Sequence, residues 1–127
     1  MKSLFKNILF SLVLFFVFSS AAVPADPHPH TVIQPNGKTL TFFIRGDERL
    51  HWYESLDGYT LLMNTDNYLE FACIDENRFL QTSGVLACNP EERGEEELSF
   101  LKTVKPKLFF SQEQIEQSKR KIPVLQK

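Results

Sequence analysis

The chain has 127 residues, of which 43% are apolar and 24% are charged, and its formal net charge is −2. This composition is ordinary for one small globular domain and is too apolar for a disordered chain. The acidic balance excludes strong nucleic-acid binding, because the phosphate backbone requires a basic protein face. The length excludes a two-domain enzyme.

The first 22 residues have the order of a secretory signal peptide. Lys2 and Lys6 precede an uncharged stretch, Ile8 to Phe18, and small residues follow up to Ala22. This order predicts a signal peptide over residues 1–22, with Ala22 as its last residue. The apolar stretch is too short for a transmembrane anchor, which needs about 20 residues. We therefore expect a secreted, periplasmic or extracellular product that meets the membrane only during export.

A proline-rich lead over residues 23–30 is expected next. Its three prolines favour an extended backbone and bias the residues before them in the same way. His28 and His30 lie two residues apart in this lead. We interpret them as part of a solvated tail rather than as metal ligands.

From Thr31 onward, short runs of β-branched and aromatic residues alternate with turn signals. The turn and break signals are Asn36-Gly37, Gly46-Asp47-Glu48, Asp57-Gly58, 64–67, 75–77 and Ser83-Gly84. Signals that recur every eight to twelve residues predict an antiparallel meander. The expected strands are 31–34, 38–45, 51–54, 59–63, 68–73, 78–81 and 85–88.

Two short helices are expected after the strands. The first covers 91–102 and starts near Pro90, although Gly94 weakens it. The second covers 111–121, where Ser111 and the glutamine three residues later form a capping box. This second helix is polar nearly all round, so it should need a partner surface.

These elements predict an α+β fold, mainly an antiparallel β meander followed by two short C-terminal helices. The expected organisation is a β-rich domain over 31–104 and a C-terminal polar helix and tail over 105–127.

Catalytic motifs are missing from the sequence. It contains no two-histidine zinc helix, no phosphate-binding glycine loop and no paired-cysteine metal motif. His51, beside Trp52 in an expected strand, is interpreted as a core or edge residue. We therefore predict no catalytic residue, no metal and no cofactor, so that the chain is not an enzyme by itself.

Cys73 and Cys88 would close a loop of about 16 residues. A bridge would stabilise the fold by roughly 3 kcal/mol, and an oxidising compartment favours it. In a three-stranded meander, however, the two residues would lie about 9.5 Å apart, beyond the roughly 7 Å limit for bridged Cα atoms. A disulfide, two buried free thiols and a metal-directed thiolate are the three alternatives.

Several motifs follow one another in a specific order. They are Gln34-Pro35-Asn36-Gly37, Gly46-Asp47-Glu48, His51-Trp52-Tyr53-Glu54, Asp57-Gly58-Tyr59, and Leu108-Phe109-Phe110-Ser111 before a glutamine-rich helix. As an ordered set, covering about Pro24 to Lys121, they resemble the N-terminal propeptide of secreted bacterial zinc metallopeptidases of the M6, or immune-inhibitor-A-like, family. Cys73 and Cys88 depart from that pattern.

The resemblance implies a non-catalytic module. In such precursors the propeptide is followed by a zinc peptidase domain, and this sequence ends at Lys127 before any such domain. The implied role is to assist folding and to inhibit the catalytic domain of a zinc metallopeptidase, in cis or in trans, until cleavage; the chain would be a functional product or a truncated precursor. The alternative is a free-standing secreted β-rich module that binds a peptide or a saccharide.

Candidate residues for these roles follow from their chemistry. Trp52, Tyr53 and Tyr59 are candidate peptidase contacts because aromatic residues anchor interfaces, and the alternative is that they form the domain's own core. Asp57 is more readily a hairpin residue than a carboxylate that reaches a zinc ion. Lys119-Arg120-Lys121 is a candidate processing site, and the alternative is a helix end whose cations suit the dipole.

Overall fold

The computed structural model describes residues 27–120. The predicted signal peptide with Ala22, and Lys121 of the candidate processing site, lie outside the described residues. The strands are β1 (His30–Ile33), β2 (Thr39–Gly46), β3 (His51–Ser55), β4 (Thr60–Met63), β5 (Leu69–Ile74) and β6 (Leu80–Leu86). The helices are the 3-10 turn η1 (Pro90–Glu92), α2 (Glu95–Leu101) and α3 (Gln112–Arg120).

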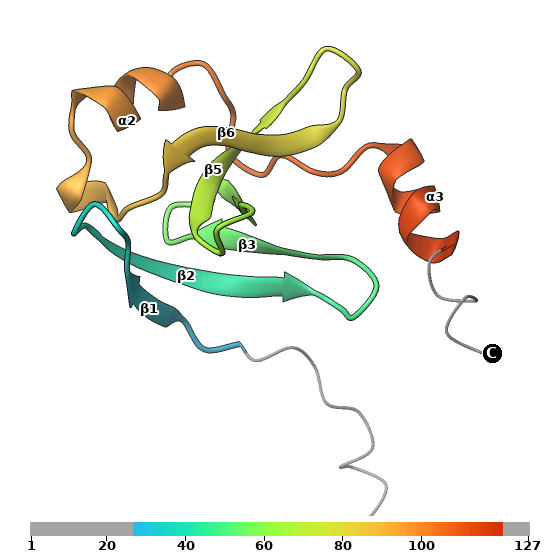
Figure 1. Cartoon of the computed structure of the whole chain (residues 1–127), viewed down its shortest axis with the longest axis horizontal. Helices are drawn as coiled ribbons and strands as arrows, with labels where there is room; N and C mark the ends of the chain where they lie inside the picture. The colour runs from blue at the N-terminus through green and yellow to red at the C-terminus, as the bar shows by residue number, and fades with distance from the viewer. Residues whose placement is uncertain (1–26, 121–127) are drawn as a thin grey trace, which may run out of the picture.

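All six strands form one antiparallel sheet in the order β1-β2-β3-β4-β5-β6. Two C-terminal helices follow it, α2 beside one end of β6 and α3 at the other side of the sheet (Figure 1). The predicted α+β fold, a meander with two helices, is therefore confirmed. Within the described residues, none of the helices is both long and apolar enough to cross a bilayer.

Four of the hairpins share one five-residue turn. Its first residues are Gln34, Ser55, Asn64 and Asp75, and in each turn the first amide donates to the fifth carbonyl at 2.8–2.9 Å while the fourth amide donates to the first carbonyl at 2.9–3.0 Å. The fourth residue has a positive φ, +84° at Gly37, +92° at Gly58, +67° at Asn67 and +68° at Arg78. This is the three-residue hairpin loop with a left-handed bulge residue. These four turn signals therefore marked hairpins correctly.

The β2–β3 connection uses a different turn. Gly46 has φ +88°, and a Cβ there would lie 2.2 Å from the Leu50 carbonyl oxygen, so only glycine fits. The Asp47 carboxylate accepts hydrogen bonds from the amides of Arg49 (2.9 Å) and Leu50 (3.1 Å). These backbone bonds lower the pKa of Asp47. The Gly-Asp-Glu motif of the sequence is thus a turn.

The sheet curls so strongly that the residues after β6 form hydrogen bonds with β2. β3 pairs only with the second half of β2, from Phe42 to Gly46. Beside the first half of β2, the Asn89 amide donates to the Thr39 carbonyl at 2.9 Å, and the Thr41 amide donates to Asn89 Oδ1 at 2.8 Å. The segment after β6 therefore replaces β3 along this half of β2.

Gln34 joins the same two ends of the sheet through its side chain. It is 3% exposed, and its Nε2 donates to the carbonyls of Leu69 at 2.6 Å and Ala87 at 3.0 Å. Buried carbonyls need such donors, since an unpaired one costs stability. The glutamine that opens the first hairpin therefore also holds the curl of the sheet.

The two predicted strands 78–81 and 85–88 are one strand, β6, and this prediction was wrong. Gly84 has φ +88° and lies in an irregularity of the ladder, where the register shifts between Glu70 and Ala72 of β5. The Glu70 carboxylate, 9% exposed, accepts the Gly84 amide at 2.6 Å. The positive φ signalled by Ser83-Gly84 serves a bulge rather than a hairpin.

The core lies between the curled sheet and α2. Its buried apolar residues are Leu40, Phe42, Leu61, Leu69, Phe71, Ala87 and Leu101. Phe71 is fully buried, and its ring lies 6.2 Å from that of Phe100 on α2 and 6.1 Å from that of Tyr59. Each large side chain buried here contributes roughly 1.5–3 kcal/mol.

The predicted helix 91–102 is divided into η1 and α2, because Gly94 interrupts it. Gly94 is extended (φ −94°, ψ −166°) and forms the N-cap of α2. Its amide donates to Glu97 Oε1 at 2.9 Å, and Lys38 of the first hairpin also bonds that carboxylate. The bond to Lys38 lowers the pKa of Glu97 and raises that of Lys38.

Helix α3 begins with the predicted capping box. The Gln114 amide donates to Ser111 Oγ at 3.2 Å, and the Ser111 amide donates to Gln114 Oε1 at 3.0 Å. Both donors at the start of the helix are thereby satisfied.

The segment between α2 and α3 is fixed to the β3–β4 hairpin. Lys107 donates its amide to the Gly58 carbonyl at 2.9 Å and its Nζ to Glu54 Oε2 at 2.8 Å, while the Thr60 hydroxyl donates to the Leu108 carbonyl at 2.6 Å. Burial would raise the pKa of Glu54, but hydrogen bonds from Lys107 and Arg45 outweigh it and lower that pKa. Lys107 and Leu108 therefore anchor this segment to the β3–β4 hairpin.

Candidate functional site

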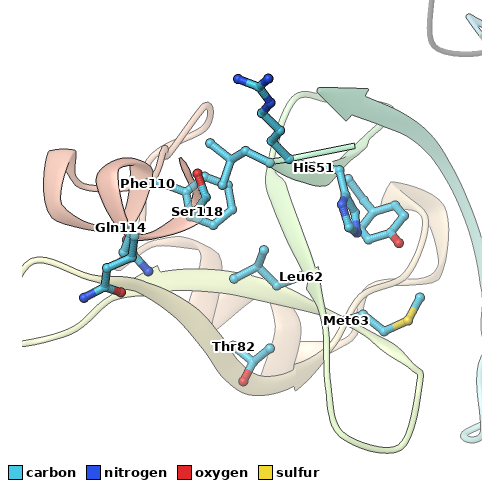
Figure 2. A pocket seen from close by; sticks show the side chains of 11 residues that line it. His51, Leu62, Met63, Thr82, Phe110, Gln114 and Ser118 are labelled. Atoms are coloured by element: carbon cyan, nitrogen blue, oxygen red, sulfur yellow. The ribbon is translucent and has the colours of Figure 1, made fainter. Parts of the chain in front are cut away.

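A groove of about 410 Å³ lies between α3 and the β3–β4 region (Figure 2). Its α3 wall carries Gln114 and Ser118, next to Phe110, and its opposite wall carries His51. Leu62, Met63 and Thr82 also line it. The lining is mixed in polarity and includes one charged side chain, Arg49.

No nucleophile and base act together in this groove as the structure describes it. The Ser118 hydroxyl donates to the Ile115 carbonyl of its own helix at 2.7 Å. His51 lies exposed at the start of β3, with its ring 6.0 Å from the edge-packed ring of Tyr53. Among residues 27–120, no group of three His, Cys, Asp or Glu side chains could hold a metal ion.

A second feature is the outer edge of β1. Within the described part of the chain, β1 pairs only with β2, so its other edge is open. The Gln34 amide donates to the Lys38 carbonyl, which makes these residues a hydrogen-bonded pair. Since such pairs alternate along an antiparallel ladder, the backbone groups of Thr31 and Ile33 point outward.

A pocket of about 280 Å³ lies beside this edge. It is lined by Val32, Ile33, Gln34, Phe42, Met63, Asn67, Tyr68 and Leu69, none of which is charged. Exposed fractions are high for its apolar rim, 76% at Ile33, 44% at Met63 and 40% at both Val32 and Tyr68. The open edge and the pocket together form what we call the β1 site.

The other edge of the sheet is covered at Leu80 by α3. The Leu80 amide donates to Gln114 Oε1 at 2.9 Å, and Gln114 Nε2 donates to the Leu80 carbonyl at 3.0 Å. The side-chain amide thus makes the two bonds that a neighbouring strand would make. No residue of α3 is buried, and Gln114 joins this polar helix to the sheet edge at Leu80.

The three candidate contact aromatics lie in different surroundings. Tyr53 and Tyr59 are half-buried and pack against the core cluster. Trp52 lies edge-on to Phe109 at 4.9 Å between ring centroids, next to the segment before α3. The structure does not gather the three on one surface, and their contact with a peptidase stays a prediction.

Asp57 is held by an arginine. Its oxygens accept two bonds from Arg93, at 2.6 and 2.8 Å, and a third from the Ser55 hydroxyl at 2.8 Å. The bonds from Arg93 lower the pKa of Asp57, and they raise the pKa of Arg93. The Arg93 side chain is only 5% exposed and lies over the rings of Tyr59 and Phe71. The carboxylate therefore fastens η1 and α2 to the β3–β4 turn, where the sequence placed a hairpin.

Cys73 and Cys88 are both free thiols, so the disulfide alternative is not formed. Cys73 pairs with Gln81 along β5 and β6, whereas Cys88 follows Ala87, whose amide bonds the Leu69 carbonyl. Along the strand direction, Cys73 and Cys88 are offset by about four residues, or roughly 13 Å, which is too far for a disulfide. The sequence-based distance assumed that Cys88 lies on a third, separate strand, but the predicted strands 78–81 and 85–88 are one strand, β6. Burial raises the pKa of Cys88.

The candidate processing site lies at the end of α3. Lys119 and Arg120 are exposed in its last turn. The position suits the helix dipole, which is the alternative weighed from the sequence.

Comparison with protein-family models, with curated proteins and with solved structures finds no match.

The sequence placed Gln34 in a hairpin motif and Gln114 in a capping box, but it did not indicate their roles at the two sheet edges. Gln34 and Gln114 act through partners 34 to 53 residues away, and local patterns carry no signal for such bonds. Met63 precedes the third copy of the repeated turn, and Tyr68 is its last residue. Because the turn recurs at the ends of successive strands, its position in the sequence could have placed these two residues at one end of the sheet.

Proposed function

We propose that this chain is a secreted, non-catalytic module that acts as the pro-region of an M6-type zinc metallopeptidase acts, by binding the catalytic domain and holding it inactive. The observation that carries the proposal is the β1 site, an open strand edge beside an uncharged apolar pocket. Exposed edges with apolar rims are recognition surfaces for other polypeptides, and proteins otherwise protect them.

The family resemblance supports this proposal by way of the fold. Its motif residues Gly37, Gly46 and Gly58 have positive φ and form turns, and Asp57 holds Arg93. These residues maintain the fold of the module, so we assign them no catalytic or ligand-binding role. The surface left for a partner is then the strand edge between the turns.

The mechanism of inhibition would be steric occupation. A peptidase holds its substrate as an extended strand, and a module whose own edge strand pairs with that region excludes substrate. The rigid curl held by Gln34 would present β1 in one orientation, so little conformational entropy is lost on binding.

The test is inhibition of a mature M6-type peptidase by residues 23–127. We expect dose-dependent loss of peptidase activity that disappears once the module is cut within the sheet, because such a cut destroys the β1 site. A matched control is the heat-unfolded chain at the same concentration, which should not inhibit. A folded chain that neither inhibits nor binds at micromolar concentration would contradict the proposal.

The same edge supports a second candidate, a free-standing secreted module that binds peptides without any peptidase. Peptide binding together with no effect on any M6-type peptidase would favour this candidate.

A further inference from the structure

The structure assigns a specific ligand chemistry to the β1 site: a short extended segment of a partner polypeptide that pairs with β1 and places one large uncharged side chain in the pocket beside Val32. This inference rests on the proposed function, because it names the part of the partner that the module holds. It can nevertheless be tested without a peptidase.

The backbone of β1 limits what can bind. Thr31 and Ile33 direct an amide and a carbonyl each toward the open edge, as the alternation from the Gln34–Lys38 pair requires. Only an extended backbone offers carbonyls and amides at this spacing. Antiparallel pairing would form two hydrogen-bonded pairs, about four bonds in all.

Two prolines bound the pairing window. Pro29 precedes β1 and has no amide hydrogen to donate, and Pro35 follows it in the first turn. The edge therefore accepts only a short strand, which also limits open-ended edge-to-edge aggregation.

The pocket specifies the side chain. Val32 lies opposite Leu40, which is fully buried, so Val32 points to the core face of the sheet. A residue opposite Val32 in the added strand would point to that face too, and it would enter the pocket between Met63 and Tyr68. At about 280 Å³ the pocket lies just below the range of whole small-molecule sites, and it suits a side chain. Its lining holds no charge that could pair with a charged group.

The probe is a capped pentapeptide, threonine-valine-phenylalanine-valine-threonine, titrated into residues 23–127 while backbone amide resonances are followed. The central phenylalanine would lie opposite Val32, and the two valines would pair with Thr31 and Ile33. We expect the largest shifts at the Thr31 and Ile33 amides. N-methylation of both valines should weaken binding at least about tenfold, whereas N-methylation of the phenylalanine should leave it nearly unchanged. Replacing the phenylalanine by aspartate should also weaken binding at least about tenfold.

The protein side of the test uses a matched pair of variants. Thr31→Pro removes the outward amide of Thr31 and should weaken peptide binding about tenfold. Thr31→Ala also loses the Thr31 side chain, with its 3.0 Å contact to Thr41, but keeps the amide, so its affinity should stay within about twofold. Retained amide dispersion in both variants shows that each is folded.

Three results would overturn the inference. The first is equal affinity for the two kinds of methylated peptide, and the second is no shift at Thr31 and Ile33 at millimolar peptide. The third is a homodimer that Thr31→Pro abolishes and Thr31→Ala retains, which would assign the edge to a second copy of this chain. Peptide binding without peptidase inhibition would contradict the proposed function but would still support this inference. Inhibition by Thr31→Pro at unchanged potency would remove the inference and leave the function standing.

Discussion

The two edges of the sheet face the same physical problem and meet it differently. An edge strand exposes backbone donors and acceptors that can pair with another chain. At β6, Gln114 of α3 satisfies both backbone groups of Leu80. At β1, Thr31 and Ile33 keep theirs directed outward, beside a pocket with an apolar rim. Helix α3 thus closes one edge at Leu80, whereas no described residue pairs with the outer edge of β1, which is the edge that we propose for binding.

The first prediction concerns the residue that fixes β1 in place, and it has the largest expected effect. Gln34→Ala leaves the carbonyls of Leu69 and Ala87 without their buried donor. We expect a loss of about 3 kcal/mol in the free energy of unfolding, measured by urea denaturation. Asn36→Ala, in the same turn but exposed, should cost under about 1 kcal/mol. Equal losses in the two variants would show that the curl does not depend on Gln34.

The second prediction tests the ion pair that holds the helical side of the molecule. Asp57→Asn leaves the buried guanidinium of Arg93 without its carboxylate and should cost about 2 kcal/mol at neutral pH, a figure reduced for the partial exposure of Asp57. The pKa of Asp57 is lowered in the folded state from its ordinary 3.8. Its contribution is therefore present above that pH and is lost as the pH falls through the lowered pKa.

The measurement is a series of chemical denaturation curves between pH 7 and pH 2. The parent chain and the variant should differ most at neutral pH and converge below about pH 3.8. A difference between them that does not change with pH would show that the charge of Asp57 contributes nothing.

The third prediction removes the cover of the closed edge. Gln114→Ala should cost about 1.5 kcal/mol, because both backbone groups of Leu80 lose their partner and Ser111 loses its acceptor. Hydrogen exchange should show the Leu80 amide becoming as unprotected as those of Thr31 and Ile33. Gln117→Ala, on the same helix, is the matched control and should leave that protection intact. If the Leu80 amide stays protected in Gln114→Ala, Gln114 is not what covers this edge, and the proposed difference between the two edges is wrong.

The smallest effect is expected at the open edge. Thr31→Pro removes an amide that points away from β2, so the free energy of unfolding should change by less than about 1 kcal/mol. Val32→Pro removes an amide that faces β2 and should destabilise the chain clearly more. The reverse order in denaturation experiments would place the outward groups on Val32 and would move the proposed binding register by one residue.

Local patterns predicted most elements, and they failed where a signal had two structural uses. Asn36-Gly37 and Asp57-Gly58 were placed in hairpins, which the structure confirms. Ser83-Gly84 carries the same signal, but Glu70 accepts the Gly84 amide and stabilises a bulge instead. Gly94 weakened the first expected helix and in fact divides it. In the first case the deciding contact is made with Glu70, which is distant in the sequence, and in the second it is the extended conformation of Gly94. The neighbouring residues reveal neither.

The sequence by itself determined the four hairpin turns and the capping box of α3, because each depends on residues within five positions of one another. The order of short strands, turns and helices along the chain also predicted the α+β class. Only the tertiary structure decided how the sheet curls, which edge is covered and which cysteines can meet. Those features depend on bonds such as Gln34 to Ala87 and Leu80 to Gln114, which join residues 53 and 34 positions apart. Such pairings form once packing has brought the strands together, so a local pattern cannot encode them.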